Sequence, residues 1–295
     1  MKTTITVMGG DARQAALAAY FARRGALVRC FGVPYSDTNT DLMSFCEWRE
    51  ALLGATAVIL PLPATHDSRH LYMQGGEMLR APRLQDVLEV LPVGTFLAGG
   101  RMSEGLLSLA REKGLRAFDY FKCEALQEAN ALPTAEGAVS ILMQELPRTV
   151  AGLSVLVTGF GRVGKALVRL LLAMGALVTV AARRSEVLSE AAALGCATLD
   201  LRVKDALADP DGRFAAIFNT VPERLLDDEC LARLSSETLL IDLASSPGGI
   251  DAEAASFRGF RTIWALSLPG KYAPVTAGEM IGAVVEDALK REGIL

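Results

Sequence analysis

The feature that most constrains the fold is a regular alternation of short segments rich in β-branched residues with longer segments rich in alanine and leucine. Such alternation is typical of βαβ units, in which each helix connects two parallel strands of one sheet. The sequence predicts strands at residues 4–8, 27–31, 57–60, 95–98 and 116–118, and again at 154–158, 177–181, 215–219, 238–242 and 261–264. We therefore expect an α/β protein built on parallel sheets.

The two series of expected strands resemble each other. GALVRC at 25–30 matches GALVTV at 175–180, and AVILPLP at 57–63 resembles AAIFNTVP at 215–222. Each series also opens with a strand that runs into glycines, in VMGGDARQ and in VTGFGRVG. Because internal similarity of this kind indicates a repeated structural unit, we predict two Rossmann-like, doubly wound parallel-sheet domains joined by hinge helices.

Two expected helices mark where the chain passes between the domains. We assign residues 1–132 to an N-terminal, flavodoxin- or Rossmann-like substrate domain, 133–150 to a linker helix and 151–274 to a nucleotide-binding domain, and we expect the helix at 275–295 to return to the first domain. Thr134 is expected to cap the first helix, and Thr276 the second in a capping box with Glu279. The substrate is then expected to bind between the domains.

Composition excludes several classes of protein. The 30 Lys and Arg against 34 Asp and Glu give a net charge of -4, without the basic excess typical of proteins that bind nucleic acid or an anionic membrane. Mean hydropathy is high, at +0.30, but the longest uncharged apolar stretch, residues 170–182, is too short to cross a bilayer. The N-terminus is typical of a strand rather than a signal peptide. We expect a cytoplasmic protein whose apolar excess lies in buried parallel sheets.

The five cysteines are scattered and contain no C-x-x-C pair. They therefore favour reduced thiols over a disulfide framework or a zinc site, and we expect no metal. The two histidines, His66 and His70, both lie in the first half of the chain. That position disfavours a 2-hydroxy acid dehydrogenase, which needs a histidine on its coenzyme domain as acid and base.

A G-x-G-x-x-G motif begins at Gly159, between the apolar segment SVLVT and the helical segment KALVRLLLAMG. In this context the motif indicates a dinucleotide-binding turn. The first glycine permits the tight turn, the second lets the backbone approach the pyrophosphate, and the third lets helix and strand pack closely. The N-terminus of the helix attracts the phosphates. The residues expected to bind the cofactor here are Gly159, Phe160, Gly161, Arg162, Val163 and Gly164.

The end of the next strand favours NADP over NAD. NAD-binding domains usually carry an acid there, which accepts a hydrogen bond from the ribose, whereas this chain has Arg183, Arg184 and Ser185, with Glu186 as the only acid expected nearby. Guanidinium groups suit a 2′-phosphate. Residues that close later strands are expected to line the nicotinamide side of the pocket: Thr220, Val221, Pro222, Ala244 and Ser245.

Five sequence blocks resemble the family of dipicolinate synthase A subunits: VMGGDARQ, NALPTAEG, VTGFGRVGKALV, LIDLASSPGGID and LPGKYAPVTAGEMI. The resemblance extends over essentially the whole chain. It implies an enzyme of sporulation, in the mother cell, that oxidises a dihydrodipicolinate from the lysine pathway to dipicolinate by hydride transfer to a nicotinamide cofactor. It also implies a partner, a flavoprotein-like B subunit. We further expect a homo-oligomer.

A flat dicarboxylate substrate requires two anion-binding contacts. The candidates are Arg13 beside the first glycine turn, Arg101, Lys271 and Thr134, and the candidate bases are Asp242 and Glu136. Structural roles for Arg13 in its turn and for Glu136 at a helix start are the alternatives. Two other functions also stay open: another NAD(P)-dependent dehydrogenase of a small amino, imino or hydroxy acid, and a non-catalytic NADP-binding partner protein.

Overall fold

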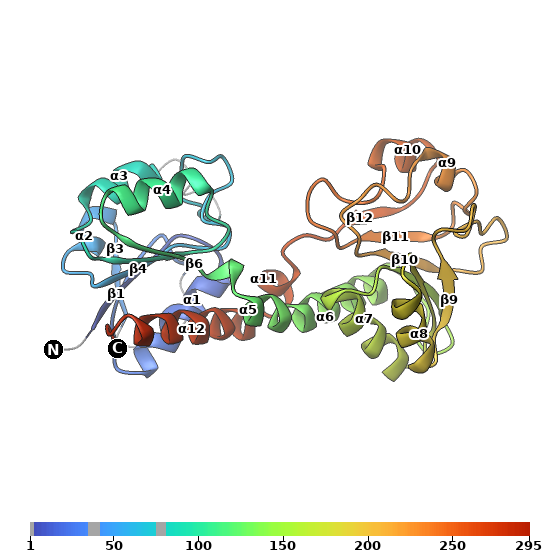
Figure 1. The fold of residues 1–295 in the computed structure, drawn as a ribbon, viewed down its shortest axis with the longest axis horizontal. Coiled ribbons are helices and arrows are strands. Elements are labelled where there is room, and N and C mark those ends of the chain that lie inside the picture. Colours follow the sequence, from blue (N-terminus) through green and yellow to red (C-terminus); the bar gives the residue numbers. More distant parts are fainter. Residues whose placement is uncertain (1–2, 35–41, 75–80) are drawn as a thin grey trace. The chain divides into compact units, whose positions relative to one another are not determined.

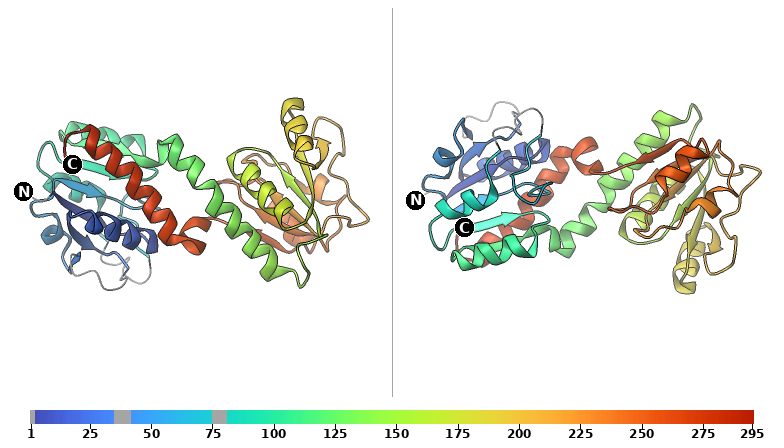
Figure 2. Two further views of the ribbon diagram at one scale, coloured as in Figure 1. Left: turned by 90° about the horizontal axis from the view of Figure 1, so that it is seen from below. Right: turned by 90° about the horizontal axis from the view of Figure 1, so that it is seen from above.

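The computed structural model describes residues 3–34, 42–74 and 81–295, and it divides into two compact units (Figure 1). Unit 1 comprises Met1–Asn130 and Ala273–Leu295, and unit 2 comprises Ala131–Tyr272. In each unit a parallel sheet carries helices on both faces (Figures 1 and 2). Within the described ranges, no helix is both long and apolar enough to cross a bilayer.

Unit 1 contains a six-stranded sheet in the order β3-β2-β1-β4-β5-β6. Its strands are β1 (Thr4–Met8), β2 (Leu27–Phe31), β3 (Leu42–Phe45), β4 (Ala57–Ile59), β5 (Phe96–Gly99) and β6 (Arg116–Asp119). Its helices are α1 (Ala12–Arg23), α2 (Trp48–Leu52), α3 (Leu84–Val90), α4 (Glu104–Glu112), α5 (Glu124–Ala129) and α12 (Pro274–Arg291). Helices α1 and α12 cover one face, and α2, α3 and α4 cover the other (Figure 1).

Two glycines let α12 lie directly against α1. A Cβ on Gly278 would stand 2.3 Å from the carbonyl oxygen of Arg13, and a Cβ on Gly282 would stand 2.6 Å from the ring of Tyr20. Real Cβ atoms are not found this close to other atoms, so a larger residue would push the helices apart. The last helix of the chain is thereby part of the core of unit 1.

Unit 2 contains a second six-stranded sheet, in the order β12-β11-β10-β7-β8-β9. Its strands are β7 (Ser154–Thr158), β8 (Leu177–Ala182), β9 (Ala197–Asp200), β10 (Ala216–Asn219), β11 (Leu239–Asp242) and β12 (Thr262–Trp264). Its helices are α6 (Ala131–Glu145), α7 (Arg162–Ala173), α8 (Ser185–Ala193), α9 (Asp228–Leu231), α10 (Ala252–Phe257) and α11 (Leu268–Tyr272).

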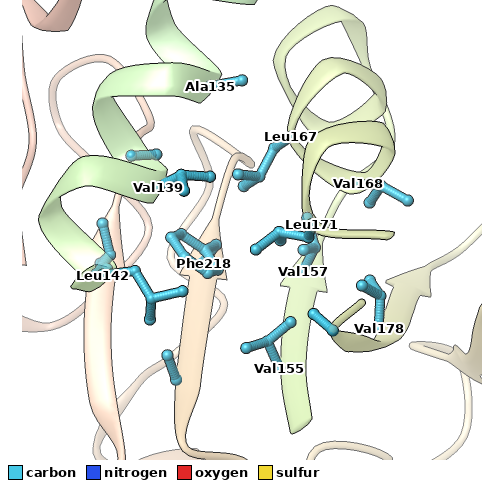
Figure 3. Close-up of a cluster of buried hydrophobic side chains, with 14 of the residues drawn as sticks. Ala135, Val139, Leu142, Val155, Val157, Leu167, Val168, Leu171, Val178 and Phe218 are labelled. Atoms are coloured by element: carbon cyan, nitrogen blue, oxygen red, sulfur yellow. The ribbon is translucent and has the colours of Figure 1, made fainter. Parts of the chain in front are cut away.

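The core of unit 2 shows why these segments fold as they do (Figure 3). Helix α6 presents Ala135, Val139 and Leu142 at a spacing of about one turn each, which is the pattern of a helix with one apolar face. These side chains lie beside Phe218 of β10, while α7 packs its own apolar residues over β7 (Figure 3). Each fully buried side chain of this size stabilises the fold by roughly 1.5–3 kcal/mol.

Counted along the chain within each unit, both sheets have the strand order 3-2-1-4-5-6 of the Rossmann fold. The predicted α/β fold with two Rossmann-like parallel sheets is therefore confirmed. The third strand of each series, β3 in unit 1 and β9 in unit 2, was not predicted from the sequence. Both are edge strands of 4 residues that are only partly buried, so neither shows the continuous apolar run that identifies an inner strand.

The two long helices begin earlier than the sequence predicted. Helix α6 begins at Ala131, which places Thr134 inside its first turn rather than at its N-cap. It ends at Glu145 and packs against α7 within unit 2, where we expected a linker. Helix α12 begins at Pro274, after an Ala273 that makes no side-chain capping bond, so the predicted capping box at Thr276 is wrong. Proline suits the first helical position because its missing N–H needs no partner there.

Candidate functional site

The glycine motif forms the turn between β7 and α7, and two of its three glycines are required by the packing of unit 2 itself. Gly159 has φ of 84°, and a Cβ there would stand 2.5 Å from Oγ1 of Thr220. Gly164 lies in the first turn of α7, where a Cβ would stand 2.6 Å from the carbonyl oxygen of Gly159. The first glycine therefore permits the tight turn and the third permits close packing.

Gly161 differs from the other two glycines of the motif. Its φ of -78° and ψ of -162° are open to any residue, and a Cβ on it would meet no described atom within 4 Å. It is the N-cap residue of α7 and makes no side-chain capping bond. The turn therefore leaves open space in front of a helix N-terminus, where backbone N–H groups and a partial positive charge favour an anion.

The other residues of the motif differ in exposure. Phe160 is buried in the core, so only its backbone is available to a ligand. Arg162 is exposed and Val163 is half-buried at the start of α7. One turn along, Lys165 pairs with Glu190, with 2.7 Å between the ammonium and carboxylate groups.

Three polar side chains join the carboxyl ends of β7, β10 and β11. Thr158 donates to Oδ1 of Asn219 at 2.7 Å, and Nδ2 of Asn219 donates to Oδ1 of Asp242 at 2.8 Å. These residues are in register across neighbouring strands. Thr220 adds a bond from its hydroxyl to the carbonyl oxygen of Thr158, at 2.8 Å. The network fixes the loops that follow the three strands.

Asp242 is buried and accepts four hydrogen bonds. Besides Asn219, the donors are the backbone N–H groups of Ala244 at 3.0 Å, Gly249 at 2.7 Å and Ile250 at 3.2 Å. A carboxylate has about four acceptor positions. The geometry therefore fits a residue that holds the loop 243–250 better than it fits the base expected from the sequence.

The loops after β10 and β11 carry the other residues expected at the nicotinamide side. In the first loop Val221 is half-buried and Pro222 is exposed. In the second loop Ala244 is buried, its carbonyl oxygen accepts from Nε1 of Trp264 at 3.0 Å, and Ser245 is exposed. Because parallel strands end at one edge of a sheet, these residues share the carboxyl edge with the glycine turn.

The end of β8 is richer in acids than the sequence indicated. Arg183 pairs with Glu223, with 2.9 Å between Nη1 and Oε2. Asp200 lies in register with Ala182 and binds Arg202 through both carboxylate oxygens. The bonds from Arg202 lower the pKa of Asp200 to about 2. The expectation that Glu186 is the only acid nearby is therefore wrong, because Asp200 and Glu223 come from segments distant in sequence.

Arg184 and Ser185 stand at the start of α8, on the surface. Arg184 is the N-cap residue of α8 and makes no side-chain capping bond. The hydroxyl of Ser185 contacts Oε1 of Glu186 at 3.3 Å. Hydrogen bonding by its own backbone N–H and by Ser185 lowers the pKa of Glu186.

The remaining candidates of unit 2 lie on α6 and α11. Glu136 is exposed and lines a surface groove of about 440 Å³ with the second half of α7, including Leu170 and Met174, rather than with the glycine turn. Thr134 is half-buried on α6, and Lys271 is exposed on α11. A Cβ on Gly137 would stand 2.9 Å from Cβ of Leu268, so the glycine lets these two helices touch.

In unit 1 the corresponding glycine turn is filled by the chain itself. A Cβ on Gly9 would stand 2.4 Å from the carbonyl oxygen of Tyr72. The N–H of Gly10 donates to that same oxygen at 2.7 Å, and the N–H of Gln74 donates to the carbonyl of Gly10 at 3.0 Å. The segment after β4 therefore lies directly on this turn.

Arg13 is buried beside this turn. Its guanidinium binds Asp11, with 2.7 Å between Nη2 and Oδ2, and donates to the carbonyl oxygen of Leu62 at 2.5 Å. Burial alone would lower the pKa of Arg13, but the hydrogen bond and charge of Asp11 outweigh it and raise that pKa. Arg13 therefore stabilises the turn, and its side chain is only 7% exposed.

Arg101, the other candidate cation of unit 1, is more accessible than Arg13. It follows β5 with φ of 55°, a conformation that is uncommon for a residue with a side chain. Asp119 holds this turn by accepting from the N–H groups of Arg101 and Met102, both at 3.0 Å. The exposed guanidinium lies 5.5 Å from the ring centre of Phe121.

Comparison with known proteins gives three likenesses to dipicolinate synthase A subunits, two of which extend over almost the whole chain. Residues 4–121 match the family described as the N-terminal domain of the dipicolinate synthase A subunit. The chain is 29% identical to the dipicolinate synthase A subunit of Bacillus subtilis (strain 168), over 97% of this chain and 95% of the relative. The crystal structure of the dipicolinate synthase A subunit from Bacillus halodurans superposes with a TM-score of 0.84 at 27% identity, over 97% of both chains. The predicted resemblance to the family of dipicolinate synthase A subunits is confirmed.

The same two-unit fold occurs beyond the dipicolinate synthase family. A transhydrogenase from Sinorhizobium meliloti has a TM-score of 0.67 at 14% identity, over 97% of this chain and 94% of that chain. At this identity the likeness is one of fold.

Sequence reasoning missed several polar residues at the carboxyl edge of unit 2. These are Thr158, Asn219, Asp200 and Glu223. Thr158 and Asn219 share a signal that could have identified them, because each is a polar residue in the last position of a predicted strand. Asp200 ends β9, which the sequence did not predict. Glu223 had no such signal, since only the fold brings its loop beside the end of β8.

Proposed function

We propose that the chain is the oxidoreductase subunit of a dipicolinate synthase, and that it oxidises a dihydrodipicolinate to dipicolinate with NADP as hydride acceptor. The full-length resemblance to proteins of that name supports the reaction. The Rossmann order of unit 2 and its glycine turn support a dinucleotide cofactor. A separate B subunit is the proposed partner.

The observation that carries the proposal is that nothing in the described structure itself requires a glycine at position 161. The protein needs Gly159 and Gly164 for its own packing, but neither the backbone conformation nor the described neighbours of Gly161 require glycine. A pyrophosphate lying against the N-terminus of α7 requires it, because a side chain there would hold the phosphates away from the N–H groups. The residues present therefore fit the cofactor.

The nicotinamide, when bound, supplies a carbon that accepts hydride from the substrate ring. The ring also loses a proton and becomes an aromatic pyridine, which makes the step favourable. In this proposal the network around Asp242 positions the loops beside the nicotinamide. Arg101, Lys271 and Thr134 are the proposed contacts to the substrate carboxylates, and Arg13 supports its turn. Glu136, expected from the sequence as a base, lies against the second half of α7 and has no part in this proposal.

The experiment supplies dihydrodipicolinate and NADP to the chain, with and without a B subunit, and follows the absorbance of reduced nicotinamide and of the pyridine product. The matched variants are Gly161→Val and Gly105→Ala. We expect Gly161→Val to weaken NADP binding by about tenfold or more, roughly 1.4 kcal/mol. It should lower the free energy of unfolding by no more than about 1 kcal/mol, because valine is less favourable than glycine at a helix N-cap. Gly105→Ala, on α4, should leave NADP binding unchanged and should not lower stability, because a Cβ there would meet no described atom closer than 4.0 Å and alanine favours the helix.

Two results would contradict the proposal. One is the absence of product with either NADP or NAD, whether or not a B subunit is present. The other is unchanged NADP affinity in Gly161→Val.

A further inference from the structure

The ion pair between Arg183 and Glu223 spans the place where a dinucleotide would enter unit 2. Arg183 directly follows β8, and Glu223 lies in the loop after β10. Both strands are neighbours of β7 in the sheet order, so these loops lie on either side of the glycine turn. The pair, at 2.9 Å, therefore joins the two sides of the crevice at which this fold binds nucleotides.

Acids meet two of the arginines near the end of β8. Glu223 binds Arg183, and Asp200, at the end of β9, binds Arg202 with two hydrogen bonds, while Glu186 lies two residues after Arg184. Two of the guanidinium groups that a 2′-phosphate could bind are therefore already held by carboxylates. The acid that meets the first arginine after the strand is Glu223.

We propose that Glu223 sets the cofactor preference of this chain by competing with a 2′-phosphate for Arg183. This inference rests on the proposed dinucleotide function. A 2′-phosphate carries up to two negative charges, so it must displace the carboxylate of Glu223 to bind Arg183, and it is repelled while that carboxylate stays near. A dinucleotide with a free 2′-hydroxyl meets no such repulsion. Glu223 therefore lowers the ratio of the affinity for NADP to the affinity for NAD.

The solvent exposure of the Arg183–Glu223 ion pair limits how far Glu223 can change the cofactor preference. The side chains of Arg183 and Glu223 are 55% and 59% exposed. Exposed ion pairs are weak and exchange readily with other partners. Removing the carboxylate should therefore shift the ratio of NADP affinity to NAD affinity by about two- to fivefold, rather than by orders of magnitude.

The test is Glu223→Gln, which keeps the size of the side chain and removes its charge. Calorimetry would give the dissociation constants of NADP and NAD, and of the fragments 2′,5′-ADP and 5′-AMP, for this variant and the unmodified chain. We expect Glu223→Gln to bind NADP and 2′,5′-ADP about two- to fivefold more tightly, with little change for NAD and 5′-AMP. In Arg183→Ala the same substitution should give a much smaller gain.

Glu237→Gln is the matched control. It removes one negative charge from an exposed glutamate of the same unit. Glu237 lies just before β11 begins, at the amino ends of the strands, whereas the glycine turn lies at their carboxyl ends. The substitution should leave the NADP to NAD ratio unchanged.

Three outcomes would overturn the inference. In the first, Glu223→Gln leaves the ratio of NADP to NAD affinity unchanged while both cofactors bind, which refutes the role of Glu223 and leaves the proposed function intact. In the second, the gain persists fully in Arg183→Ala. In the third, none of the four nucleotides binds any variant, which overturns the proposed function together with the inference.

Discussion

The two glycine turns occupy the same position in two sheets of identical strand order, yet they are used differently. In unit 1 the space beside Gly9 and Gly10 is taken by the segment around Tyr72, and the buried pair of Asp11 and Arg13 stabilises the turn. In unit 2 the space in front of Gly161 contains no described atom within 4 Å. Topology alone therefore does not make a nucleotide site, because the turn must also stay open.

The largest expected effect is on the closed turn. Arg13→Ala would leave Asp11 buried without its partner, and breaking a buried ion pair typically costs about 3–5 kcal/mol. We expect a loss of that size in the free energy of unfolding, measured by denaturant titration. Arg101→Ala, at an exposed cation of the same unit, should change stability by less than about 0.5 kcal/mol while weakening substrate binding. If the Arg13→Ala variant kept its stability and lost only substrate affinity, Arg13 would be a substrate contact rather than a structural residue.

Gly164→Ala tests the packing of the open turn. The added Cβ would stand 2.6 Å from the carbonyl oxygen of Gly159, so α7 must shift. By analogy with overpacked cores, this shift should lower the free energy of unfolding by about 1–3 kcal/mol. NADP affinity should fall as well, since the helix N-terminus moves. Thermal unfolding and calorimetric titration would measure the two effects. Unchanged stability would show that α7 does not rest on this glycine.

Asp242→Asn tests the network beside the open turn. The amide of asparagine accepts hydrogen bonds only at its oxygen, because its nitrogen is a donor. Some N–H donors of the loop 243–250 would therefore lose their acceptor, which should lower the free energy of unfolding by about 1–3 kcal/mol. We expect lower stability and weaker cofactor binding, with residual turnover. Turnover that disappears while stability and cofactor affinity are both retained would instead identify Asp242 as the catalytic base.

Among the variants of the open turn, the smallest effect on stability is expected at Gly161. Gly161→Ala adds a methyl group that contacts no described atom, so the expected cost is only the lower preference for alanine at the N-cap, a loss of no more than about 1 kcal/mol in the free energy of unfolding measured by denaturant titration. A larger destabilisation would mean that this glycine serves the fold rather than a ligand.

Much of this comparison was accessible from the sequence. The inner strands and the motif from Gly159 to Gly164 are visible as apolar runs and glycine spacing, which depend on neighbours along the chain. The edge strands β3 and β9 were not, because they are short and half-exposed. The pairing of Arg183 with Glu223 and the burial of Arg13 were not either. They arise from contacts between segments distant in sequence, which no local pattern records.

Amide hydrogen exchange with and without NADP tests the central claim most directly, because it reports on both turns in one experiment. We predict that NADP slows exchange in peptides covering residues 159–165 and leaves those covering residues 9–14 unchanged. Protection at residues 9–14, or none at residues 159–165 under saturating NADP, would contradict the assignment of the open turn as the nucleotide site.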